Sequence, residues 1–109
     1  MERTKDEEKE KDFYKVYPRI YRSIDYNDKT VTIELSIPGV SKENIEIKVR
    51  PTWFHLSAVR PEEKVEYAAN QNFGVEIVPE NTTAEYFQGL LKIKAKIRDP
   101  LDNAKEIKF

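Results

Sequence analysis

The chain has 109 residues, enough for one domain with a single hydrophobic core. It carries 19 basic and 20 acidic residues, so no net field attracts nucleic acid or an anionic membrane, and neither is an expected partner. Because it has no cysteine, no apolar run that could span a bilayer and no stretch resembling a signal peptide, we expect a cytoplasmic protein.

Residues 1–17 are predicted to be a charged N-terminal arm. Residues 1–12 offer no apolar side chain after Met1, so burial cannot offset the entropy lost on ordering them. We expect this part to be disordered or a frayed helix, and a solubilising role is favoured over a docking role. The aromatic cluster at Phe13–Tyr17 is the first material that could contact a core or a partner.

The next segments alternate apolar and polar residues, as strands do. Residues 19–26 favour a strand, and Asn27–Lys29 supplies turn chemistry. Residues 30–37 and 45–49 then alternate most clearly, which predicts two half-buried strands. Pro38 lacks a backbone donor and Gly39 permits positive φ, so we expect a structural turn between these two strands.

Residues 53–59 predict a fourth strand, with Phe54, Leu56 and Ala58 on one face. Its other face carries His55, the only histidine, which has no cysteine or second histidine to complete a metal site. A plain solvent-side strand residue is therefore favoured over a ligand or base, and no metal site is predicted. Residues 60–72 are polar and predict a loop, with room for a short strand at 65–67.

The last third of the chain predicts three more strands. Residues 73–78 alternate, with Gly74 indicating a bulge or an edge; residues 80–83 predict a turn, and 84–87 a short strand. Gly89 turns the chain into residues 91–97, whose polar face carries Lys92, Lys94, Lys96 and Arg98. A solvated strand face is favoured over phosphate binding, because carboxylates are abundant nearby and edge lysines discourage aggregation.

Residues 101–109 form a predicted C-terminal tail after a folded domain at 18–100. Ile107 and Phe109 are spaced by two, so both side chains point the same way if the tail is extended. They could plug two adjacent pockets on a sheet edge, or they could pack on their own domain, and the sequence leaves both interpretations open.

About seven or eight short strands without a convincing helix predict an all-β fold, a two-sheet antiparallel sandwich. The chain has no Gly-x-Ser-x-Gly, no Gly-rich phosphate loop, no HExxH and no second histidine. We therefore expect neither an enzyme nor a cofactor.

Four fragments in order resemble the α-crystallin domain of small heat shock proteins, the Hsp20 family. Residues 35–47 (LSIPGVSKENIEI) resemble its L-x-x-PGV-x-K-E-D-I-x-V stretch. Residues 54–58 are similar to its L-x-I-S-G strand, 78–81 to its L-P-E-N, and 84–93 to its A-x-x-x-x-G-V-L-x-I. Together the fragments cover about residues 19–98, nearly the whole predicted domain.

This resemblance implies an immunoglobulin-like β-sandwich and an ATP-independent chaperone, a holdase that binds partly unfolded proteins in the stress response. It implies an apolar groove between the strands at 53–59 and 90–97, and a homodimer or small homo-oligomer. The tail residues Ile107 and Phe109 would dock in that groove of a neighbouring subunit, while Pro38, Gly39 and Gly89 would be structural turn residues. The predicted groove residues are Phe54, Leu56, Leu91, Ile93 and Ala95.

Two departures from the family pattern keep other functions open. The N-terminal arm is short and charged where the family has a long apolar one, and residues 60–72 are short for a loop that carries a swapped dimerisation strand. Both departures favour a monomeric adaptor similar to the CS-domain and p23 co-chaperones. A structural domain without client binding is the third alternative.

Overall fold

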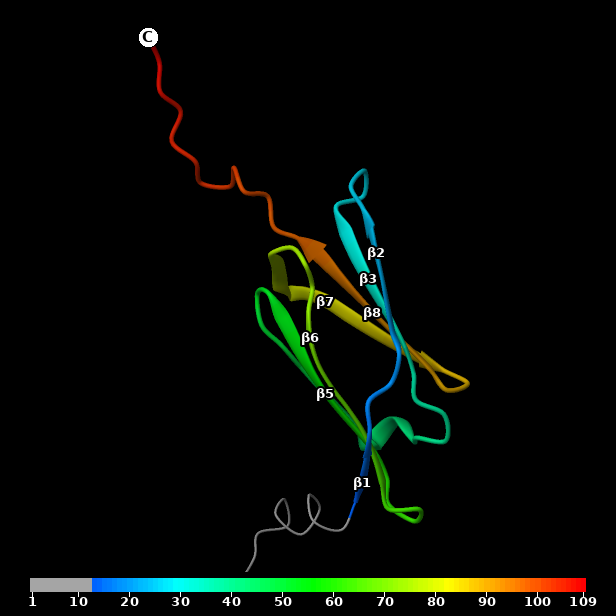
Figure 1. Ribbon diagram of the computed structural model, residues 1–109. Helices are drawn as coiled ribbons and strands as arrows, with labels where there is room; N and C mark the ends of the chain where they lie inside the picture. Colours follow the sequence, from blue (N-terminus) through cyan, green and yellow to red (C-terminus); the bar gives the residue numbers. More distant parts are fainter. Residues whose placement is uncertain (1–12) are drawn as a thin grey trace, which may run out of the picture.

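The computed structural model describes residues 13–109, in which eight strands form two packed β-sheets (Figure 1). This arrangement confirms the predicted all-β, immunoglobulin-like sandwich. The only helical element among these residues is a single 3-10 turn, η1 (Lys42–Asn44). The strands are β1 (Tyr14–Val16), β2 (Ile20–Asp25), β3 (Thr30–Ser36), β4 (Ile45–Val49), β5 (Trp53–Arg60), β6 (Val65–Asn72), β7 (Ile77–Phe87) and β8 (Leu90–Ile97).

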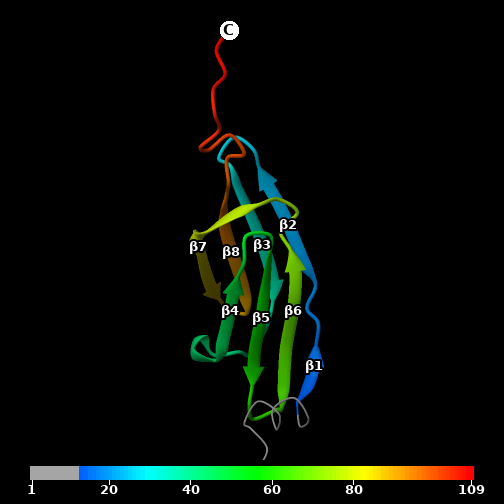
Figure 2. The same cartoon turned by 90° about the vertical axis from the view of Figure 1, so that its left-hand side faces the viewer.

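One sheet has the strand order β1-β6-β5-β4 and the other has the order β2-β3-β8-β7 (Figure 2). All neighbours are antiparallel except β1 and β6, which pair in parallel. The chain passes from the first sheet to the second between β1 and β2, where Pro18 cannot donate a ladder hydrogen bond.

The core lies between the two sheets, because the apolar residues at alternate positions of each strand point into the space between them. Ile33 of β3 pairs with Ile93 of β8, and both are fully buried. Phe54 and Leu56 of β5 face them from the other sheet, and the Phe54 ring lies 5.4 Å from the ring of Phe73. Successive side chains of a strand point to opposite faces, so the charged residues between these positions reach solvent.

The predicted loop at 60–72 is wrong for most of its length. Strand β6 pairs with the whole of β5, from Trp53 opposite Asn72 to Arg60 opposite Val65, and only residues 61–64 form the turn. Alanine, asparagine and glutamine have low strand propensity, which hid this strand. Pairing with β5 and burial of Tyr67 and Ala69 override that propensity.

The predicted boundaries after residue 72 are also wrong. Phe73 is buried, but residues 73–76 lie outside any strand, and Gly74 has a φ of +81° there. Residues 80–83 are not a separate turn, because β7 continues through an irregularity between Val78 and Thr82. Pro79 lies in this irregularity, where its missing N–H interrupts no regular ladder.

Strand β1 lies within the segment predicted as the N-terminal arm, and its pairing with β6 was not predicted. Residues 1–12, the charged part of that arm, lie outside the described residues.

The segment Ile37–Gly39, here called the corner, carries the chain from β3 in one sheet to β4 in the other. The Tyr67 hydroxyl of the first sheet donates to the Pro38 carbonyl (3.4 Å), and the Tyr86 hydroxyl of the second donates to the Ile37 carbonyl (3.1 Å). Ile37 N–H donates to the Gly89 carbonyl at 2.8 Å. The corner is therefore bonded to both sheets.

Arg60 covers the corner from the end of β5. Gly39 has a φ of +81°, and a Cβ at this position would lie 2.7 Å from Arg60 Nε. Hydrogen bonding with the Tyr67 hydroxyl, and to a smaller extent the nearby Glu63 carboxylate, raises the pKa of Arg60. Arg60 therefore stays charged throughout the physiological pH range.

We expect Gly39→Ala to lower the free energy of unfolding by at least about 1–2 kcal/mol, because an L-residue is strained at this φ and meets Arg60. Urea denaturation followed by circular dichroism measures the change. Ser41→Ala is the matched control, since Ser41 lies in the same connection with a φ of −82° and makes no side-chain capping bond. Equal stability of the Gly39→Ala variant and the wild type would contradict this account of the corner.

Candidate binding groove

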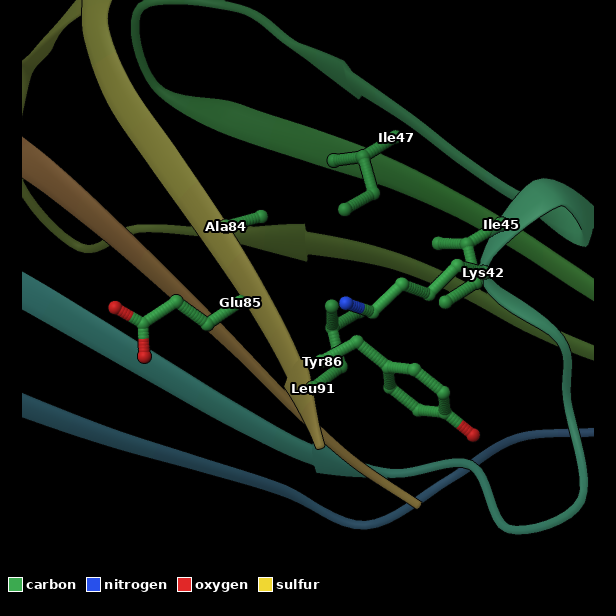
Figure 3. Close-up of a pocket in the computed structure, with 7 residues that line it drawn as sticks. All are labelled: Lys42, Ile45, Ile47, Ala84, Glu85, Tyr86 and Leu91. Carbon is green, nitrogen blue, oxygen red and sulfur yellow. The ribbon is translucent and has the colours of Figure 1, made fainter. Parts of the chain in front are cut away.

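A cavity of about 400 Å³ opens between β4 and β7, the edge strands of the two sheets (Figure 3). Each of these strands pairs with only one neighbour among the described residues, so no further strand closes this side of the sandwich. We call this cavity the edge groove. It is lined by Lys42, Ile45, Ile47, Ala84, Glu85, Tyr86 and Leu91.

Most residues that line the edge groove are apolar because both edge strands turn alternate residues inward. Ile45 and Ile47 of β4 are half-buried, whereas Glu46 between them is exposed. Ala84 and Tyr86 of β7 pair with the core residues Ile93 and Leu91 of β8, so they share the inward face. The groove therefore presents apolar surface that remains open to solvent beside the closed core.

Tyr86 is the most strongly positioned wall residue. Its hydroxyl donates to the Ile37 carbonyl, which fixes the ring at one end of the groove. Lys42 from η1 lies at the same end, and its side chain extends toward Tyr86, whereas the Glu85 carboxylate points away from the other lining residues (Figure 3). One end of the groove is thus aromatic and basic.

The five predicted groove residues are brought together by the fold, but as part of the core. Phe54, Leu56, Leu91, Ile93 and Ala95 each have an exposed fraction of 0 or 1%. Their strands, β5 and β8, each have a neighbour on both sides in their sheets, so these five side chains lie between the sheets and not at an edge. Only Leu91 also lines the edge groove.

Sequence reasoning missed Ile45, Ile47, Ala84 and Tyr86 as lining residues. Their alternation with charged neighbours was visible, but alternation does not tell which strands lie at the edges of their sheets. The sequence does not give the order of the strands in each sheet. An inward-facing residue can line an open groove only when its strand lies at or next to the edge of its sheet.

The tail residues Ile107 and Phe109 are among the most exposed apolar residues, with Ile107 exposed to 73%. The tail extends beyond the end of the sandwich in both views (Figures 1 and 2). In this structure the two side chains therefore do not occupy the chain's own groove.

The other surface residues singled out by sequence have polar neighbours. His55 Nδ1 lies 2.6 Å from Asn70 Oδ1 on the outer face of its sheet. In the basic row on β8, Lys92 lies 3.8 Å from the Glu34 carboxylate and Lys96 donates to the Asp28 carbonyl. Just beyond β8, Arg98 pairs with Glu76 at 3.1 Å. The row is thus partly neutralised.

Two features are absent from residues 13–109. No group of three or more His, Cys, Asp or Glu side chains is placed to hold a metal ion in this range. Within the same range, no helix is long and apolar enough to cross a membrane.

Comparison with solved structures places the fold in one class. Heat shock protein 16.0 from Schizosaccharomyces pombe superposes with a TM-score of 0.67 at 18% identity, over 87% of this chain and 76% of that chain. A mutant of hsp14.1 from Sulfolobus solfataricus gives 0.65 at 16% identity, over 76% and 77%. A small heat shock protein from Xylella fastidiosa, reported with a distinct high-order structure, gives 0.63 at 14%, over 88% and 98%.

The class is thus the immunoglobulin-like β-sandwich, and within it the chain has the α-crystallin fold of the small heat shock proteins, as its sequence motifs predicted. No family model and no curated protein sequence matches this chain. At identities below one fifth, these structures define the fold alone.

We expect Tyr86→Phe to lower the free energy of unfolding by about 1 kcal/mol, because the Ile37 carbonyl loses its side-chain donor while the ring remains. Chemical denaturation measures this difference. Tyr26→Phe is the matched control, since Tyr26 is 75% exposed. A loss of the same size in both variants would show that the corner contact contributes nothing specific.

Proposed function

We propose that this chain is an ATP-independent holdase of the small heat shock type, acting in the cytoplasm on partly unfolded proteins. The observation that carries this proposal is the edge groove, an open apolar surface between two sheet edges in an α-crystallin fold. A holdase needs no chemistry. It needs only apolar surface that covers the apolar segments a client exposes while it unfolds.

An extended client segment suits the geometry of the edge groove. Alternate apolar side chains of such a segment point the same way and can enter between β4 and β7. The two edge strands also present backbone groups toward the opening, which can pair with the backbone of the client. Binding of this kind would select client segments in which apolar and polar residues alternate, rather than one particular sequence.

We further propose that the chain forms a homodimer or a small homo-oligomer through its tail. Ile107 and Phe109 have the alternate spacing that the groove requires, and both are exposed. Docking of this tail in the groove of a neighbour would cover both apolar surfaces at once. The same surface then serves assembly and client binding, so the two compete.

A monomeric adaptor is the second candidate. It is favoured by the short turn at 61–64 and by the pairing of β6 with β5 of the same chain, which leave no long loop available for exchange with a partner. An adaptor would bind one defined protein at fixed stoichiometry.

We expect the wild-type chain to suppress the heat-induced aggregation of a model client, followed by light scattering at equal mass. Ile47→Asp should lose at least about half of this protection, because a carboxylate in the groove cannot be buried beside apolar client surface. Glu46→Gln, on the exposed face of the same strand, should protect as the wild type does. No suppression by the wild type would exclude the holdase.

We expect a solution mass above that of the monomer for the full chain, and a lower mass for Ile107→Ser/Phe109→Ser, measured by multi-angle light scattering. Both side chains are exposed in the single chain, so their replacement should leave the sandwich folded. Lys105→Ser, also in the tail, is the control and should keep the mass of the wild type. A monomeric wild type that captures one stoichiometric partner would favour the adaptor.

A further inference from the structure

Four side chains form one patch on the outer face of the second sheet, beside the turn between β7 and β8. Phe87 pairs with Leu90, and Glu85 pairs with Lys92, across the two strands. Paired residues of antiparallel strands point to the same face, and all four line one shallow depression of about 250 Å³. We call this depression the tip patch. It lies on the face opposite to the core, since Leu91, which separates Leu90 from Lys92, is buried.

The apolar half of the tip patch is exposed and held in place. Phe87 is 74% exposed and Leu90 is 43% exposed, so both present apolar surface to solvent. In the turn between them, the Gly89 carbonyl accepts the N–H of Ile37 at 2.8 Å. A Cβ on Gly89 would lie 3.1 Å from Pro38 Cα, so the turn packs directly on the corner. Apolar side chains presented in this way are typical of the centre of a protein–protein contact.

The charged half of the tip patch is only partly neutralised within the chain. The Lys92 ammonium lies 3.8 Å from the carboxylate of Glu34 on β3, on the side away from β7, and the Lys92 side chain is still 36% exposed. Among residues 13–109 no basic side chain forms an ion pair with Glu85, whose carboxylate points outward (Figure 3). The patch therefore offers one carboxylate and one ammonium to a partner.

The tip patch is complementary to itself. Two copies of the patch can face each other about a two-fold axis that runs parallel to the strands, which places β7 of one copy over β8 of the other. Phe87 then meets the partner's Leu90, and Glu85 meets the partner's Lys92. An axis across the strands would instead place β7 over β7, where either two Glu85 carboxylates or Phe87 and Glu85 would face each other. Charge and apolar surface therefore select the first arrangement.

We propose that the tip patch binds the tip patch of a second copy of this chain about this two-fold axis. Burial of Phe87 and Leu90 drives the contact, and the two Glu85–Lys92 pairs set its orientation. The patch is smaller than the interface of a stable dimer, so the dissociation constant is on the order of 100 μM. This inference goes beyond the proposed function, because the contact does not use the tail and leaves the edge groove open.

The test uses the full-length chain carrying Ile107→Ser and Phe109→Ser, so that the tail does not contribute to association. Sedimentation equilibrium over a concentration series that brackets the expected dissociation constant measures self-association of this parent chain. Adding Phe87→Ser should weaken association at least about tenfold, because the apolar surface of the ring is lost. Tyr21→Ser is the matched control, since Tyr21 is another exposed aromatic residue of the same sheet, and it should associate as the parent does.

The two-fold arrangement is tested by exchanging charges between two variants of the parent chain. Glu85→Lys alone and Lys92→Glu alone should each associate more weakly than the parent, because like charges face each other in both homodimers. Mixed in equal amounts, the two variants should associate with each other, because every charged contact then joins a lysine to a glutamate. High salt should weaken this mixed association. A mixture that associates no better than either variant alone would overturn the arrangement.

No self-association of the parent chain, or equal association of the parent and its Phe87→Ser variant, would overturn the inference altogether. The holdase proposal is decided separately, because suppression of client aggregation is measured on a different surface. Circular dichroism of each variant shows that it is folded, and Glu85 and Phe87 are both exposed, so their replacement leaves the core unchanged.

Discussion

The corner between β3 and β4 is the constraint on which the rest of the sandwich depends. At this point the chain leaves one sheet for the other, and its carbonyls would lose hydrogen bonds unless side chains supplied donors. Tyr67 and Tyr86 supply them, one from each sheet, and the Gly89 carbonyl accepts the Ile37 N–H. The relative position of the two sheets is thus fixed by hydrogen bonds as well as by the apolar core.

The same contact shapes the edge groove. Tyr86 reaches the corner with its hydroxyl and forms a wall of the groove with its ring, so the residue that closes the crossing also limits what can enter beside Ile45. A ring held at its far end cannot swing aside without breaking this bond. A structural requirement of the crossing therefore determines one end of the edge groove, while Ala84, which has no such hydrogen bond, leaves the other end open.

Much of this fold could be predicted from the sequence, because β3, β4, β5 and β8 each alternate apolar residues around the core. The motif around Pro38 and Gly39 then indicated the α-crystallin type. Of strand β6 only a possible short strand at 65–67 could be predicted, since the small and amide residues that follow have low strand propensity and are held in the strand by pairing with β5. The predicted groove residues lie in the core for a related reason: alternation identifies inward-facing residues, but the order of strands decides which of them lie at an edge.

The open edge of a β-sheet favours aggregation, since the unpaired backbone groups of an edge strand can pair with any other extended chain. In this chain both strands beside the groove alternate inward apolar residues with outward charges, Glu46 and Lys48 on one strand and Glu85 on the other. The charges oppose close approach of another sheet, while the inward apolar residues leave the edge groove open. A groove flanked in this way is more accessible to a single extended segment than to a whole sheet, and the proposed holdase would depend on that difference.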